Sequence, residues 1–101
     1  MANATVNNRK QKLIYRTSTG LYYSHVNPHT GKLGQYGADV YDVEGDENHV
    51  VLFATSGRTG SRLNNTKTVV TKERYESLAD LHDPYDNFPF HNAVMSEMGF
   101  M

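Results

Sequence analysis

The sequence predicts a mainly β (α+β) fold: a single antiparallel sheet, or a partly open small barrel, of about five or six strands. Three observations predict it. Residues 11–71 consist of short segments rich in Leu, Ile, Val, Thr and Tyr, separated by turn residues. The apolar spacing then becomes helical over 72–82. The 101 residues have room for one hydrophobic core, so the chain is expected to be a single domain over 1–101.

The β segments are expected to follow one another as a meander over 11–71. Turn residues at 17–20 and at 27–31 predict two hairpins, and an acidic turn at 44–48 joins the next two segments. The apolar run at 50–54 predicts the central strand, because continuous apolarity implies cover on both faces. The expected strands cover residues 12–16, 21–26, 33–36, 39–43, 49–55 and 66–70.

One helix is expected after the last strand. Apolar residues over 72–82 fall on one helical stripe, and Thr71 is a suitable N-cap. Pro84 ends this helix at or before the residue that precedes it. Residues 85–101 are then expected as an apolar C-terminal arm, extended apart from one or two helical turns over 93–98.

Composition excludes several functions. The chain has no cysteine, which excludes disulfides, cysteine-ligated zinc and thiol catalysis. A net charge of −1 and a pI near 6.5 argue against a dedicated nucleic-acid binder. Residues 1–10 read as a polar N-terminal arm with no signal peptide, and no apolar run is long enough for a membrane span. We therefore expect a cytoplasmic protein, or a virion protein if the source is viral, with no membrane partner.

The charge is arranged in blocks along the chain. Residues 1–38 contain basic residues and no acidic ones, whereas 39–47 contain acidic residues and no basic ones. The basic residues expected to contact a partner are Arg9, Lys10, Lys12, Arg58 and Arg62. The expected acidic patch comprises Asp39, Asp42, Glu44, Asp46 and Glu47. Such blocks allow positive and negative faces to meet between subunits.

No motif indicates a catalytic residue, a cofactor or a metal. The sequence Gly57-x-x-Gly60 follows an apolar strand as a dinucleotide loop would, but the first glycine of that motif is missing. His25 and His29 have metal-ligand spacing for a helix, but Pro28 between them excludes one. We expect no cofactor and no small-molecule substrate. A catalytic site assembled only in space stays open.

The C-terminal segment carries most of the large apolar residues that could dock on a partner. They are Phe88, Phe90, Val94, Met95, Met98, Phe100 and Met101. This segment either closes over the chain's own sheet or docks on a neighbouring subunit.

We expect a non-enzymatic assembly or interaction module, such as a small phage virion component, whose partners are copies of itself or neighbouring proteins. The alternative is a regulator whose partner is either nucleic acid or an enzyme that acts on nucleic acid. It would bind this partner through the basic N-terminus and the Arg-containing Gly/Ser loop.

Overall fold

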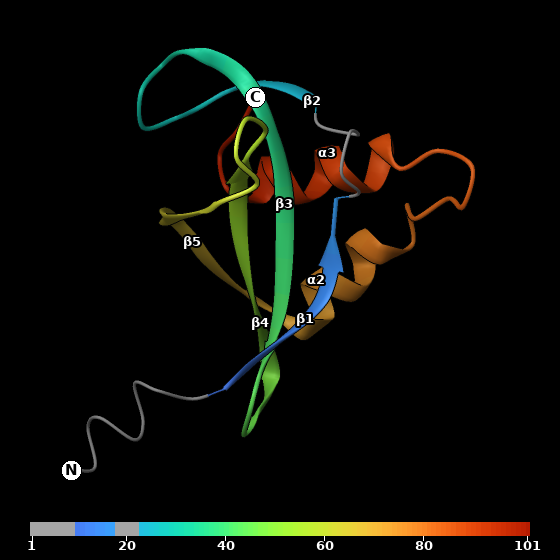
Figure 1. Cartoon of the computed structure of the whole chain (residues 1–101). Coiled ribbons are helices and arrows are strands. Elements are labelled where there is room, and N and C mark those ends of the chain that lie inside the picture. Colours follow the sequence, from blue (N-terminus) through green and yellow to red (C-terminus); the bar gives the residue numbers. More distant parts are fainter. Residues whose placement is uncertain (1–9, 18–22) are drawn as a thin grey trace, which may run out of the picture.

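The computed structural model describes residues 10–17 and 23–101 (Figure 1). Within these residues the fold is mainly β, with one open antiparallel sheet of five strands that is not closed into a barrel, and two short helices. The elements are β1 (Gln11–Arg16), β2 (Tyr23–Val26), β3 (Leu33–Val43), β4 (Asp46–Ser56), β5 (Arg62–Thr71), α2 (Lys72–Ala79) and α3 (Phe88–Glu97). The predicted fold class is confirmed.

The strand order β1-β3-β4-β5 confirms β4 as a central strand. The two segments expected at 33–36 and 39–43 form one continuous strand, β3, which is long enough to pair with two partners along one edge. β1 pairs with its second half and β2 with its first half, both antiparallel. The expected hairpin between the first two segments is therefore wrong, because β1 and β2 run in the same direction along β3. Its loop at 17–20 lies mostly outside the described residues.

The remaining strands are joined by tight turns. Gly45, with φ of 81°, allows the acidic turn between β3 and β4. The turn between β4 and β5 is tied to β3, because Gly57 N–H donates to the Gln35 carbonyl over 2.9 Å. This second turn leads into a strand and not into a helix, so it lacks the helix N-terminus that a dinucleotide-binding loop requires.

The two helices cover one face of the sheet and form the hydrophobic core with it (Figure 1). Alternate residues of β4, namely Val50, Leu52 and Ala54, point into this core. The helices contribute, among others, Leu78 from α2 and Val94 from α3. The other face of the sheet therefore carries the intervening residues of β4.

The helix predicted over 72–82 is confirmed in its start and shortened at its end. Thr71 is the N-cap, and its hydroxyl oxygen accepts a hydrogen bond from Arg74 N–H over 3.1 Å. The helix ends at Ala79, and Leu81 N–H donates to the carbonyl of Leu78 in a closing turn. His82, the last position of the predicted helical stripe, therefore lies outside the helix.

Of the two alternatives for the C-terminal segment, the structure shows the first: the segment packs against the chain's own sheet. Most of it forms α3, which is longer than the turns expected at 93–98. The Val26 and Met101 backbones pair through N–H···O contacts of 2.7 and 3.3 Å, so the segment also covers the outer edge of β2. Neither helix in the described part of the chain is long and apolar enough to cross a membrane.

Candidate functional site: the open face of the sheet

The face of the sheet opposite the helices is left uncovered by the described elements, and we call it the open face. The strand registers place on it side chains from β1, β3, β4 and β5. Its members are Gln11, Leu13, Arg16, Asp39, Tyr41, Val51, Phe53, Thr55, Arg62, Asn64, Lys67 and Val69. The face combines cations with apolar side chains, of which Val51 and Phe53 are buried and Leu13 and Val69 are exposed.

Asp39 lies at the centre of the open face and is only 1% exposed. Arg16 donates to both of its carboxylate oxygens, over 2.9 and 3.0 Å, and the Tyr41 hydroxyl donates to one of them over 3.0 Å. The hydrogen bond with Asp39 raises the pKa of Arg16 above its ordinary value. Asp39 is therefore neutralised within the chain and does not form an acidic patch with the other four predicted residues.

Arg62 is a second basic residue that the open face holds in a defined position. Its guanidinium carbon lies over the ring of Phe53, 4.3 Å from the centroid, and 5.5 Å from the centroid of Tyr41. Nε donates to the Asn64 side-chain oxygen over 3.1 Å, and Nη1 lies 3.5 Å from that of Gln11. Among the described residues Arg62 has no carboxylate partner. Stacking and hydrogen bonds thus hold this cation in place without neutralising it.

Exposed aliphatic residues accompany these cations. Val69 on β5 is 56% exposed and Leu13 on β1 is 38% exposed. Lys67, two residues before Val69, adds a second exposed cation. A face that offers exposed cations beside exposed aliphatic groups suits a partner that is both acidic and apolar.

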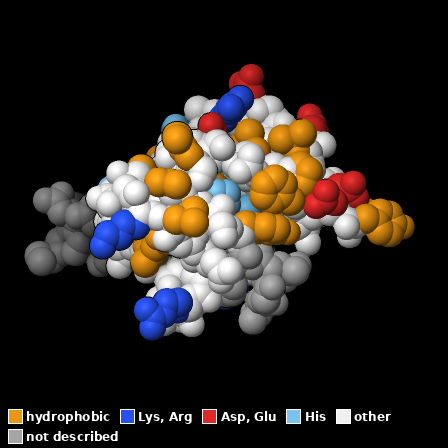
Figure 2. All heavy atoms as spheres, turned by 90° about the horizontal axis from the view of Figure 1, so that it is seen from above, with side chains coloured by type: hydrophobic (Ala, Val, Ile, Leu, Met, Phe, Trp, Pro, Cys, Tyr) orange, Lys and Arg blue, Asp and Glu red, His pale blue; other side chains and the backbone are white. Residues whose placement is uncertain are grey.

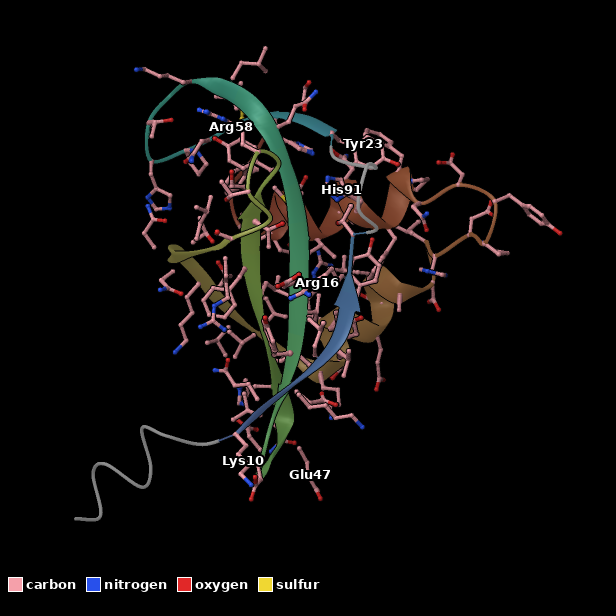
Figure 3. The ribbon with its side chains drawn as sticks, in the orientation of Figure 1. Lys10, Arg16, Tyr23, Glu47, Arg58 and His91 are labelled. Atoms are coloured by element: carbon pink, nitrogen blue, oxygen red, sulfur yellow. The ribbon has the colours of Figure 1, made fainter. Side chains whose placement is uncertain are left out.

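The predicted basic set does not form one patch. Arg9 lies outside the described residues. Figure 3 shows Arg58 near the upper end of the molecule, Lys10 at the lower end and Arg16 between them. Lys12 is opposite Asp42 in the register of β1 and β3. Of the four predicted basic residues that the structure describes, only Arg62 belongs to the open face.

The acidic patch is confined to four residues around the turn between β3 and β4: Asp42, Glu44, Asp46 and Glu47. Lys72 reaches Asp42, with Nζ 3.7 Å from a carboxylate oxygen. Hydrogen bonds from Asn48 N–H and the His49 ring lower the pKa of Asp46. In the part of the chain that is described, no three His, Asp or Glu side chains are arranged to hold a metal ion.

The predicted partner-docking set is corrected by the structure. Five of its seven residues are buried in the core: Phe90, Val94, Met95, Met98 and Phe100. Only Phe88 and Met101 remain exposed. The physical reason is that α3 supplies most of the apolar cover for one sheet face, so the same side chains cannot also dock on a partner.

A buried histidine pair is the feature that sequence reasoning missed. Nε2 of His25 on β2 lies 2.9 Å from Nε2 of His91 on α3, and both rings are buried. Thr17 Oγ lies 3.2 Å from Nδ1 of His91 and accepts from Ala38 N–H. Figure 3 shows His91 beside Tyr23, and the centroids of these two rings are 4.6 Å apart. The two residues are 66 positions apart, and no spacing rule connects them.

The environment of this pair keeps both histidines neutral at neutral pH. Burial, and to a lesser extent the neighbouring His25, lower the pKa of His91 to about 4. Burial also lowers the pKa of His25, although a backbone hydrogen bond with Met101 opposes this effect. A contact between two Nε2 atoms needs one donor and one acceptor, so both Nε2 atoms cannot carry a proton. The pair joins the end of β1, β2 and α3.

Comparison of the chain with known protein families, with curated proteins and with solved structures finds no match in any of the three.

Proposed function

We propose that this chain is a non-enzymatic assembly or interaction module that binds an acidic surface of a partner protein through its open face. The observation that carries the proposal is Arg62, a cation held over Phe53 on an uncovered sheet face without a carboxylate partner among the described residues. Because its geometry is already fixed, little side-chain entropy is lost when a partner carboxylate binds it.

The size of the available contacts supports binding. A hydrogen bond between charged groups contributes about 1.5–3 kcal/mol where water is excluded. Burial of an exposed aliphatic side chain such as Val69 adds up to about 1.5–3 kcal/mol. One such ion pair and two such side chains supply at most about 4.5–9 kcal/mol, which is comparable to the cost of association of about 4–15 kcal/mol, so the complex also needs contacts from the rest of the open face.

The partner is proposed to be a protein and not a nucleic acid. Unspecific single-strand binding uses exposed aromatic rings on which bases stack. On the open face Phe53 is only 4% exposed, and Arg62 lies over it and beside Tyr41. Neither ring offers a free face to a base, whereas the exposed apolar residues there, Leu13 and Val69, are aliphatic.

This proposal keeps the assembly role expected from the sequence and moves its contact surface from the C-terminal segment to the sheet. The proposal includes the setting expected from the sequence: the chain is a structural component of a virion, such as a small phage protein. A particle with repeated subunits presents a protein neighbour to each copy.

Fluorescence anisotropy with three labelled probes tests the proposal: a short peptide of Asp, Leu and Tyr, the same peptide with Lys in place of Asp, and a short single-stranded oligonucleotide. We expect the acidic peptide to bind most tightly, and more weakly as salt rises. Arg62→Glu is expected to weaken this binding at least about tenfold. The matched control is Arg58→Glu, which reverses an exposed arginine in the turn between β4 and β5.

Circular dichroism of each variant checks that it is folded. Equal binding by the Arg62→Glu and wild-type proteins, or tighter binding of the oligonucleotide than of the acidic peptide, would overturn the proposal.

A further inference from the structure

The connection between α2 and α3 is an exposed acidic loop, residues 80–86. Its three acidic side chains, Asp80, Asp83 and Asp86, are all exposed. Two large apolar side chains lie among them: Leu81, and Tyr85, which is 97% exposed. The loop stands out from the body of the molecule at the right of Figure 1, and Figure 2 shows acidic and hydrophobic side chains together at that side.

Internal hydrogen bonds define the shape of the acidic loop. Tyr85 N–H donates to a carboxylate oxygen of Asp83 over 2.8 Å, and Phe88 N–H donates to one of Asp86 over 3.1 Å. Asp86 N–H donates to the Asp83 carbonyl over 3.2 Å. The backbone of Tyr85 is thus held in a hydrogen-bonded turn, while its ring is exposed to solvent. Exposure of a large ring to water is unfavourable, and exposed apolar groups often mark a contact surface.

The acidic loop and the open face have complementary chemistry. The loop combines carboxylates with exposed apolar groups, and residues 75–101 contain no lysine or arginine. The open face combines Arg62 and Lys67 with the exposed aliphatic residues Leu13 and Val69, and its one carboxylate, Asp39, is neutralised by Arg16. The acidic loop and the open face are therefore opposite in charge, and both also carry exposed apolar side chains.

The two surfaces cannot meet within one molecule. The acidic loop joins the helices, which cover one face of the sheet, whereas the open face is on the opposite side. We propose that the acidic loop of one copy of this chain binds the open face of a second copy. This inference rests on the proposed function and names the partner.

In this arrangement Tyr85 packs against Leu13 or Val69, and Asp83 and Asp86 pair with Arg62 and Lys67. Each copy then contributes one loop and one face, so the contact is head-to-tail. A head-to-tail contact leaves a free loop at one end and a free face at the other, and it extends to further copies unless the rotation closes a ring.

Two complementary variants of the full chain test the inference. The face variant is Arg62→Glu with Lys67→Glu. The loop variant is Asp83→Asn, Tyr85→Ala and Asp86→Asn, in which the asparagines keep the side-chain oxygens that accept from Tyr85 and Phe88 N–H. A control, Glu73→Gln with Glu76→Gln, removes two exposed acids of α2 outside the loop.

Sedimentation velocity over a range of concentrations gives the readout. We expect the wild type and the control to associate as concentration rises. Each complementary variant alone is expected to bind itself at least about tenfold more weakly. An equimolar mixture of the two is expected to form a heterodimer that does not grow, because only one intact loop and one intact face remain to pair.

Three results would overturn the inference: a monomeric wild type at all concentrations, a loop variant that associates like the wild type, or a mixture that stays monomeric. Binding of the designed acidic peptide to Arg62 without association of the intact chain would leave the proposed function standing and overturn only the identity of the partner.

Discussion

Protonation of the buried histidine pair is expected to destabilise the fold as the pH falls from 7 to 4.5. In the folded chain His91 is fully buried and its Nε2 contacts Nε2 of His25. A proton added to His91 places a positive charge on a ring that is removed from water. The unfolded chain has no such restriction.

The magnitude follows from the difference in pKa between the two states. His91 has the ordinary value of 6.5 when unfolded and a value of about 4 when folded, because burial disfavours its charged form. The stabilisation is therefore complete above pH 6.5 and is lost as the pH falls toward 4. Between pH 7 and 4.5 His91 alone accounts for a loss of about 2 kcal/mol. His25, whose pKa is also lowered, adds to the loss.

Urea unfolding at a series of pH values measures this loss. His91→Gln is the informative variant, because its amide can donate to His25 and accept from Thr17 but does not titrate. We expect this variant to lose about 2 kcal/mol less than the wild type between pH 7 and 4.5, whatever its stability at pH 7. His29→Gln, at an exposed turn position, is expected to keep the wild-type pH dependence. A wild-type free energy of unfolding that stays constant over this range would refute the reasoning.

Three further substitutions test how the sheet and α2 are held, each by urea unfolding. Arg16→Ala leaves the buried carboxylate of Asp39 without its cation and is expected to cost about 2–3 kcal/mol; an unchanged midpoint would mean that this carboxylate is solvated. Gly57→Ala places a Cβ 2.8 Å from the Gln35 carbonyl oxygen and is expected to cost about 1–3 kcal/mol, which wild-type stability would contradict. Thr71→Ala removes the N-cap of α2 and is expected to cost about 1 kcal/mol; no loss would show that the cap is dispensable.

The parts of the fold that follow local rules were predictable. The apolar run at 50–54 identified the central strand, because β4 lies between β3 and β5 and its residues 50–54 are all buried, those on the open face among the neighbouring side chains of that face. Thr71 identified the start of α2, since capping depends on a few neighbouring residues. The end of α2 was predicted wrongly, at residue 82, because His82 falls on the same helical stripe although the helix ends at Ala79.

The parts that depend on long-range pairing were not predictable. A turn-rich loop after β1 indicates a hairpin locally, but β3 is long enough to pair with both β1 and β2, and that choice is made at the level of the sheet. The C-terminal apolar residues are expected to be buried, but the sequence does not show whether the chain's own sheet or a neighbouring subunit buries them.

The candidate site was predicted in part. Arg62 was expected to contact a partner from its place in a basic loop, but its stacking on Phe53 depends on the pairing of β4 with β5. Asp39 looked like part of an acidic patch because the sequence does not show that Arg16 lies opposite it. The pairing of His25 with His91 likewise exists only in the folded chain.

The most direct test of the central claim, that the open face is a contact surface for the acidic loop, is dilution of isotopically labelled protein followed by amide spectra. Dilution is expected to shift signals from two places only, β1 and β5 near Arg62 and the loop at residues 80–86. Spectra that do not change with concentration, or changes confined to other surfaces, would contradict the account.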